Sequence, residues 1–201
     1  MYNIIVINLK KILLLFFIFI YKDSFGNQNR IFDYLQTFSS LKSNFIQVNN
    51  NGDILTGKIF LIRPGKVRIN YNEIPLLIIS DGQKVATINK KLKSISFYKL
   101  SDVPIKLLLF KNFKYDNIKV LNLEESENQI VIQLAEIKKE SNGYVEIIFE
   151  KQPFIMKKWI VFRDKFTKTE ILLNNLKLNE KVRLELFDID NHDPRQRVLP
   201  N

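Results

Sequence analysis

The side chains that could carry out catalytic chemistry are few in this sequence. The chain has no cysteine and a single histidine, His192, which stands in the polar segment Asp190-Asn191-His192-Asp193-Pro194. Without cysteine there is no thiol nucleophile, no Cys-ligated zinc and no disulfide scaffold. One histidine also excludes any site that needs two imidazoles. We interpret His192 as a surface residue of a polar tail.

The acidic residues around His192 suggest a metal site only superficially. Asp188, Asp190 and Asp193 have a calcium-like spacing, but the glycine and the final glutamate of a calcium loop are missing. The sequence also lacks a G-x-S-x-G motif, a Walker loop and a dinucleotide-binding glycine motif. A hydrolase with paired carboxylates is not excluded by composition, but nothing supports one. We therefore expect no catalytic residues, no metal and no cofactor, and predict that the protein is not an enzyme.

The composition is that of one globular domain with a basic surface. Of the 201 residues, 46% are hydrophobic and 26% are charged, which excludes a disordered chain. The net charge of +10 comes mainly from 24 scattered lysines, and no RNP, helix-turn-helix or zinc-finger pattern accompanies them. We interpret the charge as a solvated surface and expect no nucleic-acid partner. The 16 phenylalanines and seven tyrosines favour apolar binding instead.

The first residues have the pattern of an export signal. Two lysines precede an unbroken apolar run, Ile12–Tyr21, and small residues follow at Ser24 and Gly26. This run of ten residues is too short for the roughly 20 that span a bilayer. An uncleaved anchor is the alternative. We predict export to the periplasm, a signal peptide over residues 1–26 with cleavage after Gly26, and a single domain over residues 27–201.

Two kinds of hydrophobic periodicity follow along the chain. Apolar residues at helical spacing over Asn27–Leu41 predict one amphipathic helix. From Asn44 onward the period changes to two, as in Val67-Arg68-Ile69-Asn70-Tyr71, where the odd-numbered positions are apolar. The expected strands are Asn44–Val48, Ile54–Ile62, Val67–Tyr71, Leu76–Ile79, Lys84–Asn89, Lys93–Lys99, Lys119–Leu123, Ile130–Glu136, Tyr144–Glu150, Ile155–Phe162, Thr169–Leu173 and Val182–Phe187.

Polar turns separate these strands, and one helical segment interrupts them. Asn174-Asn175 is expected to be such a turn, and the tail from Asp188 is expected to be loose. The segment Ser101–Asn112 predicts a short helix that is too apolar to face water. The fold class predicted is mainly β with some α: an incomplete, highly curved antiparallel barrel of about eleven strands. An N-terminal helix and an inserted lid helix would cover its apolar cavity.

Three motifs in order resemble those of a known family. Asn44-Phe45-Ile46-Gln47 is followed by a strand that ends in Arg63-Pro64-Gly65, and then by Ser80-Asp81-Gly82. Together with the signal pattern and the missing lipidation cysteine, this resembles the LolA family of periplasmic outer-membrane lipoprotein carriers. The resemblance covers roughly Asn29–Asp193.

The resemblance implies a fold, a cargo and a set of partners. The family fold is an incomplete eleven-stranded barrel with helices as a lid over an apolar cavity. The implied activity is lipoprotein transport: acylated lipoproteins are taken from an inner-membrane ABC-type release complex and carried to an outer-membrane acceptor lipoprotein, where one is present. We expect a monomer that binds acyl chains without a cofactor.

The resemblance also assigns residues. Arg63 stands where the family has an arginine that contacts the lid. Val67 and Ile69 stand where the family usually has aromatic side chains, and Ala86 and Ile88 also depart from the family pattern. The expected cavity residues are Leu61, Val67, Ile69, Tyr71 and Ile88, and the expected lid and lid-contact residues are Arg63, Ile105, Leu108 and Leu109.

Other classes remain open. The chain can be a periplasmic lipid or small-hydrophobe binding protein with no role in lipoprotein sorting. A sensor domain of similar fold would normally carry a second domain, and the outer-membrane acceptor is itself a lipoprotein with a cysteine. A lipid-processing enzyme needs a nucleophile with a base, and the single histidine is badly placed for that.

Overall fold

The computed structural model describes residues 22–100, 109, 118–137, 143–164 and 166–195. The chain forms two compact units, Met1–Leu35 and Gln36–Asn201. The elements are α2 (Lys22–Thr37), β1 (Ser40–Val48), β2 (Ile54–Ile62), β3 (Lys66–Tyr71), β4 (Leu76–Asp81), β5 (Lys84–Asn89), β6 (Ser94–Lys99), β7 (Ile118–Glu125), β8 (Gln129–Glu136), β9 (Tyr144–Lys151), β10 (Phe154–Phe162) and β11 (Lys168–Leu178), followed by the 3-10 helices η5 (Leu184–Phe187) and η6 (Asp190–His192).

The helix α2 is displaced toward the N-terminus relative to the prediction. It begins at Lys22 rather than Asn27, so the expected cleavage point after Gly26 falls inside it, and it ends at Thr37. Leu41 was expected in the helix but belongs to β1. The cause is competition from the sheet, because backbone pairing of Ser40 with Ile62 draws the chain into an extended conformation. No described helix is long and apolar enough to cross a membrane.

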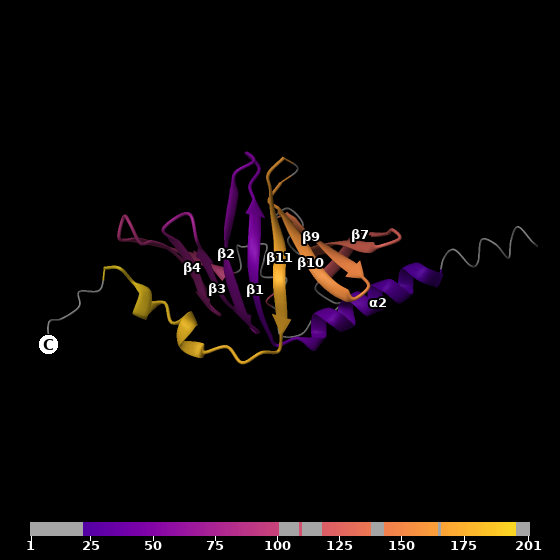
Figure 1. Ribbon diagram of the computed structural model, residues 1–201, viewed down its shortest axis with the longest axis horizontal. Helices are drawn as coiled ribbons and strands as arrows, with labels where there is room; N and C mark the ends of the chain where they lie inside the picture. The colour runs from indigo at the N-terminus through magenta and orange to yellow at the C-terminus, as the bar shows by residue number, and fades with distance from the viewer. Residues whose placement is uncertain (1–21, 101–108, 110–117, 138–142, 165, 196–201) are drawn as a thin grey trace, which may run out of the picture. The chain divides into compact units, whose positions relative to one another are not determined.

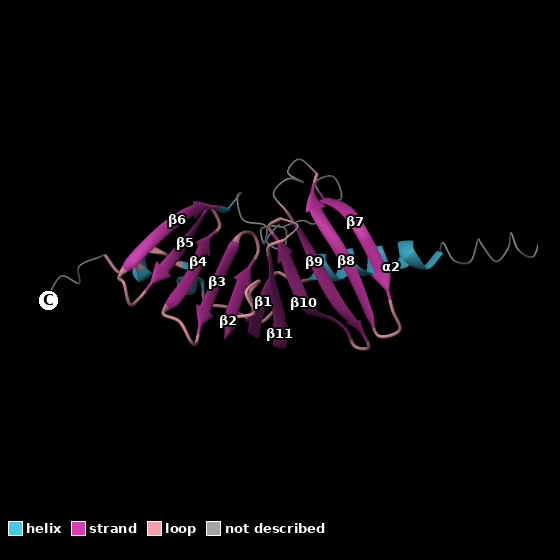
Figure 2. Cartoon of the chain, turned by 90° about the horizontal axis from the view of Figure 1, so that it is seen from above, coloured by secondary structure: helices cyan, strands magenta, loops and turns pink. Residues whose placement is uncertain are grey.

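The second unit is built on one antiparallel sheet of eleven strands. The strand order is β6-β5-β4-β3-β2-β1-β11-β10-β9-β8-β7, and β1 pairs with β11 although the two are far apart in the sequence. The sheet is curved and does not close, since β6 and β7 are its two edges (Figures 1 and 2). This confirms the predicted incomplete barrel. Of the predicted inserted helix, Ser101–Asn112, only Leu109 lies within the described residues.

One predicted turn is instead an irregularity within a strand. β11 continues through Asn174 and Asn175 to Leu178, and its register against β1 shifts between Lys42 and Asn44. Asn175 has a φ of 56°, a left-handed conformation that asparagine tolerates better than most residues. The Ser43 hydroxyl donates a hydrogen bond to the Asn174 carbonyl across the shift, at 2.9 Å. The asparagine pair therefore produces a bulge and not a chain reversal.

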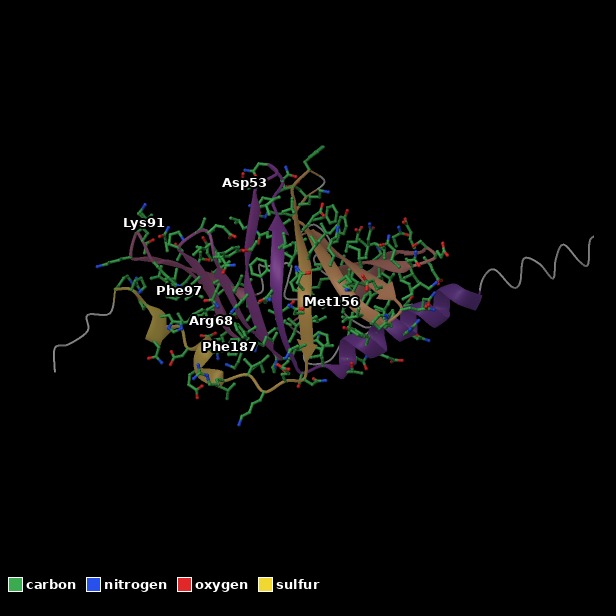
Figure 3. All side chains as sticks on the ribbon, in the orientation of Figure 1. Asp53, Arg68, Lys91, Phe97, Met156 and Phe187 are labelled. Carbon is green, nitrogen blue, oxygen red and sulfur yellow. The ribbon has the colours of Figure 1, made fainter. Side chains whose placement is uncertain are left out.

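The C-terminal segment also differs from the prediction. Val182–Phe187 was expected to be a strand, but residues 184–187 form η5. Asn179, with a φ of 59°, follows the end of β11, and Arg68 Nη1 donates a hydrogen bond to the Leu186 carbonyl at 2.8 Å. Figure 3 shows Arg68 beside the segment that carries Phe187. The tail after Asp188 is not loose throughout, because Ile189 is only 3% exposed.

Candidate functional site

One face of the sheet gathers four of the five expected cavity residues. Leu61 pairs with Val67 across β2 and β3, and in the same hairpin Ile59 pairs with Ile69. Directly opposed residues of an antiparallel pair point to the same side, so these side chains share a face with Tyr71 two positions further on. Leu61 and Val67 are fully buried, while Ile69 and Tyr71 are partly exposed. We call this side of the sheet the apolar face.

The apolar face extends across the other half of the sheet. The pairings of β1 with β11 and of β8 through β11 with one another carry the same alternation as far as β8. Nine of its apolar side chains there are less than 5% exposed. They are Ile130, Ile132, Leu134, Val145, Ile147, Phe149, Met156 (labelled in Figure 3), Trp159 and Leu173.

An aromatic pair on this face packs over a glycine. The rings of Phe45 and Tyr71 meet edge to face, with centroids 5.5 Å apart. Gly57 lies opposite both residues, and a Cβ there would come within 2.7 Å of the Phe45 ring and would collide with the Asn70 carbonyl oxygen. The Tyr71 hydroxyl donates a hydrogen bond to Gln47 Oε1 at 2.8 Å, and burial raises the pKa of Tyr71. A glycine inside a strand is the sequence signal for such a close approach.

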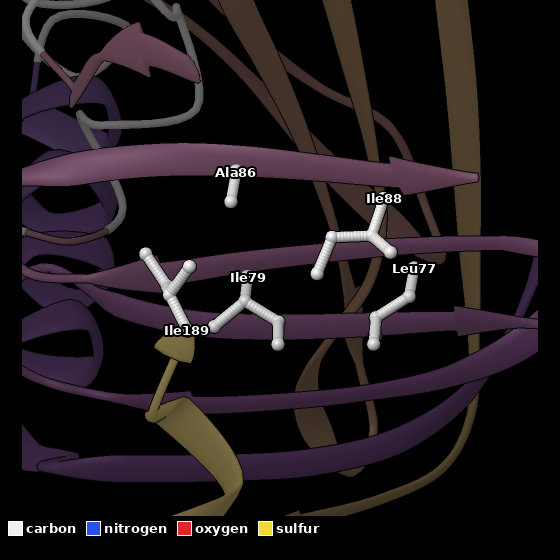
Figure 4. Close-up of a cluster of buried hydrophobic side chains, with 5 residues drawn as sticks. All are labelled: Leu77, Ile79, Ala86, Ile88 and Ile189. Atoms are coloured by element: carbon white, nitrogen blue, oxygen red, sulfur yellow. The ribbon is translucent and has the colours of Figure 1, made fainter. Parts of the chain in front are cut away.

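Ile88 is not brought together with the other expected cavity residues. It pairs with Leu77, which itself pairs with Asn70, so the register places Ile88 on the face opposite to Ile69 and Tyr71. There it forms a buried cluster with Leu77, Ile79, Ala86 and Ile189 (Figure 4). Strand β5 carries buried apolar residues on the side away from the apolar face because the C-terminal segment covers that side. The sequence Lys84–Asn89 alone does not indicate which of its residues belong to the apolar face.

Arg63 follows the end of β2 and contacts the segment that precedes β1. Its Nη1 donates a hydrogen bond to the Phe38 carbonyl at 3.2 Å, and its guanidinium carbon lies 3.8 Å from the centroid of the Phe38 ring. The Arg63 backbone N–H donates to the Ser39 carbonyl at 2.8 Å. Burial lowers the pKa of Arg63 to about 10, so the guanidinium remains charged at neutral pH. Arg63 is therefore a buried cation in contact with a carbonyl and an aromatic ring of the same residue.

The turn that follows Arg63 joins two of the sequence motifs to the inserted segment. The Gly65 N–H donates a hydrogen bond to the Leu109 carbonyl at 3.0 Å. A Cβ on Gly65, whose φ is 77°, would come within 2.7 Å of the Gly82 Cα. The Arg-Pro-Gly and Ser-Asp-Gly motifs are thus two hairpin turns in contact, each requiring glycine. Of the expected lid residues, Leu109 is buried at this place, whereas Ile105 and Leu108 lie outside the described residues.

Asn179 is a site residue that the sequence did not reveal. Its side-chain Nδ2 donates to the Thr37 carbonyl at 3.1 Å, and its Oδ1 accepts from the Ser39 N–H at 2.8 Å. With Arg63, it supplies donors to the three successive carbonyls of residues 37, 38 and 39. We call Arg63, Asn179 and residues 37–39 the clasp. An asparagine after a long strand is typical of a turn, so no sequence signal distinguishes this role.

The described side chains of the apolar face are mainly hydrocarbon, so the site can shelter a hydrophobic ligand from water. His192 lines a different pocket, of about 540 Å³, together with Arg68, Leu77 and Ile88 on the opposite face. Among the described residues no three His, Cys, Asp or Glu side chains lie close enough to hold a metal ion. An open, curved antiparallel sheet with one continuous apolar face and a charged contact at the end of β2 defines a class of hydrophobe-binding proteins.

Comparison with known proteins identifies the family. The model of the family described as "Outer membrane lipoprotein carrier protein LolA" matches residues 36–190, so the chain belongs to the LolA family. Proteins of this family are periplasmic and bind lipophilic cargo; they are binding proteins and chaperones and not enzymes. No curated protein matches the chain significantly.

Solved structures of similar fold are distant in sequence. A DUF1329 family protein from Desulfovibrio piger ATCC 29098 is 10% identical with a TM-score of 0.51, over 80% of this chain and 94% of that chain. A LolA superfamily protein from Nitrosomonas europaea is 11% identical with a TM-score of 0.44, over 78% of this chain and 92% of that one. An uncharacterized conserved protein from Thermus thermophilus is 7% identical with a TM-score of 0.48, over 80% and 92% respectively. At these identities the likeness concerns the fold alone.

Proposed function

We propose that the protein is a periplasmic carrier that shelters the acyl chains of lipoproteins against the apolar face and takes them from the inner to the outer membrane. The observation that carries this proposal is the combination, within one LolA-family chain, of a buried apolar face and the clasp at its end. An apolar face without a releasable contact would suit a permanent binder better than a carrier.

The apolar face supplies what an acyl chain needs in water. Transfer of each methylene group out of water is favourable by about 0.8 kcal/mol, so one chain represents on the order of 10 kcal/mol. In the proposal, Leu61, Val67, Ile69 and Tyr71 line the chain on β2 and β3. Aliphatic walls at Val67 and Ile69 bind without directional bonds and therefore tolerate acyl chains of varied length.

The clasp supplies a means of release. In the proposal, the Arg63 contacts to Phe38 stabilise the closed, empty state, and acyl chains enter when these contacts open. Because opening breaks the hydrogen bond from Arg63 to the Phe38 carbonyl and the contact with the Phe38 ring, the empty protein favours closing, and closing helps to expel cargo. Leu109, joined to the same turn by its carbonyl, is proposed to belong to the lid with Ile105 and Leu108.

The remaining parts of the proposal concern location and partners. We infer cleavage of the signal peptide after Gly26 and a monomeric mature domain over residues 27–201. The donor of cargo would be an inner-membrane ABC-type release complex, and the recipient an outer-membrane acceptor lipoprotein where one is present. The family match and the basic, cysteine-free composition support these inferences.

The test compares two charge substitutions on one strand. Ile69→Glu places a carboxylate on the apolar face, where an unpaired charge is costly, whereas Asn70→Glu adds the same charge on the opposite face. Wild-type protein and the Asn70→Glu variant should release lipoproteins from inner-membrane vesicles, and Ile69→Glu should not. Mass spectrometry of the purified periplasmic protein separates the alternative. Bound free lipid with no lipoprotein release would indicate a lipid or small-hydrophobe binder instead.

A further inference from the structure

One buried polar group on the apolar face is unsatisfied. Trp159 on β10 is 1% exposed, and its indole Nε1 is a buried donor for which the described part of the chain supplies no hydrogen-bond acceptor. By contrast, the Tyr71 hydroxyl on the same face is bonded to Gln47. Trp159 is also the single tryptophan of the chain.

The register explains why the sheet supplies no acceptor there. Trp159 pairs with Ile171 of β11 on one side and with Ile147 of β9 on the other, and Ile147 pairs in turn with Ile132 of β8. All four side chains point to the apolar face, and three of them are purely aliphatic. Backbone carbonyls of a paired strand are engaged in the sheet ladder. The next polar side chain along this row is Gln47, which pairs with Ile171 on the far side of β11.

A buried indole N–H without an acceptor is unusual and destabilising. Indole is a donor only, so its hydrogen-bonding capacity is met by an acceptor or not at all. Most buried polar groups in native proteins are paired, with protein or with an ordered molecule, because an unmade hydrogen bond leaves the full desolvation penalty. A phenylalanine would fill much of the same volume without that penalty. An acceptor brought by a bound molecule accounts for an indole at this position.

We propose that the Trp159 N–H donates a hydrogen bond to the carbonyl oxygen of a fatty acyl ester or amide bound on the apolar face. The inference rests on the proposed function, and it adds that the site recognises the acyl carbonyl as well as the hydrocarbon. Long-chain acyl esters and amides carry one strong acceptor oxygen at the head of an apolar chain. A plain hydrocarbon of the same length has no acceptor and leaves the indole unpaired.

The experiment uses two probes of matched length, methyl palmitate and heptadecane. Affinities are measured by displacement of an apolar fluorescent dye from the wild-type protein and from Trp159→Phe. The control is Tyr144→Phe, which removes a hydroxyl from an aromatic ring on the opposite face of the sheet, where Tyr144 stacks on Phe162. The ratio of ester affinity to hydrocarbon affinity should be roughly fivefold higher in the wild type and in Tyr144→Phe than in Trp159→Phe, which is the factor expected of one neutral hydrogen bond.

A second measurement reads the indole directly in the wild-type protein and does not depend on the folding of a variant. The Nε1–H proton resonance of the single tryptophan should move downfield when methyl palmitate binds and stay in place when heptadecane binds. If both probes bind but the resonance responds equally and Trp159→Phe keeps the wild-type ratio of ester to hydrocarbon affinity, the indole contact is refuted while apolar binding stands. If neither probe binds to the wild type, both the inference and the proposed function are overturned.

Discussion

The substitution Arg63→Leu separates a gated carrier from a passive binder. It removes the hydrogen bond to the Phe38 carbonyl and the contact with the Phe38 ring, but leaves the backbone bond to Ser39. A hydrogen bond from a charged donor contributes about 1.5–3 kcal/mol and a desolvated cation–π contact about 1–2 kcal/mol. Leucine recovers part of the lost free energy, because it buries hydrocarbon without the desolvation penalty of the cation. The closed state should lose about 2–3 kcal/mol, which shifts the closed-to-open ratio roughly 30- to 150-fold.

The assay has two stages, because gating affects them in opposite directions. Arg63→Leu should accept lipoproteins from inner-membrane vesicles at least as well as the wild type, since less work is needed to open the clasp. It should deliver them to outer membranes poorly, since closing no longer helps to expel them. The matched control is Arg68→Leu, which loses a 2.8 Å hydrogen bond from an arginine to a carbonyl on the opposite face. Unchanged delivery by Arg63→Leu, or an equal defect in Arg68→Leu, would refute the gating role.

Three further outcomes are expected. Gly57→Ala should destabilise the fold by about 2–4 kcal/mol, because its Cβ collides with a backbone carbonyl that cannot move cheaply; the urea midpoint measures this. Asn179→Ala should cost about 1–3 kcal/mol, through the lost bond to the Thr37 carbonyl and a left-handed φ, and Asn179→Gly should recover only the backbone part. Hydrogen bonds from lysines lower the pKa of Glu170 below 4.5 in the folded state, so its stabilisation is present above that pH and is lost as the pH falls through the lowered value. Glu170→Gln should therefore flatten the acid side of the thermal melting profile, and an unchanged profile would argue against that ion pair.

Much of the fold follows from period-two patterning and turn chemistry. The alternation in Val67–Tyr71 predicts correctly which side chains share a face. A strand has only two sides, and its polar residues occupy the side that is more exposed to water. The glycines of the two motifs mark turns that need a positive φ, and the structure shows these turns in contact. The open sheet of eleven strands could be predicted from the sequence, because short strands joined by polar turns usually pair with their sequence neighbours.

What the sequence could not predict depends on partners distant in the chain. Ile88 lies on the opposite face because the C-terminal segment buries that side of β5, through a contact with Ile189. Asn174-Asn175 has the composition of a turn, but β11 continues through both residues as a bulge because it pairs with β1 on either side of them. Helical spacing continues to Leu41, although sheet pairing at Ser40 ends the helix earlier. In each case tertiary pairing overrides a local pattern.

The proposed function depends most on whether acyl chains lie against the apolar face of β2 and β3. The direct measurement is site-specific photo-crosslinking, with a photoreactive phenylalanine analogue placed at Ile69 or, as the control, at Asn70 on the other side of the same strand. After incubation with inner-membrane vesicles and illumination, we expect covalent adducts with lipoproteins from position 69 and none from position 70. Equal adducts from both positions, or adducts from position 70 alone, would contradict the proposal.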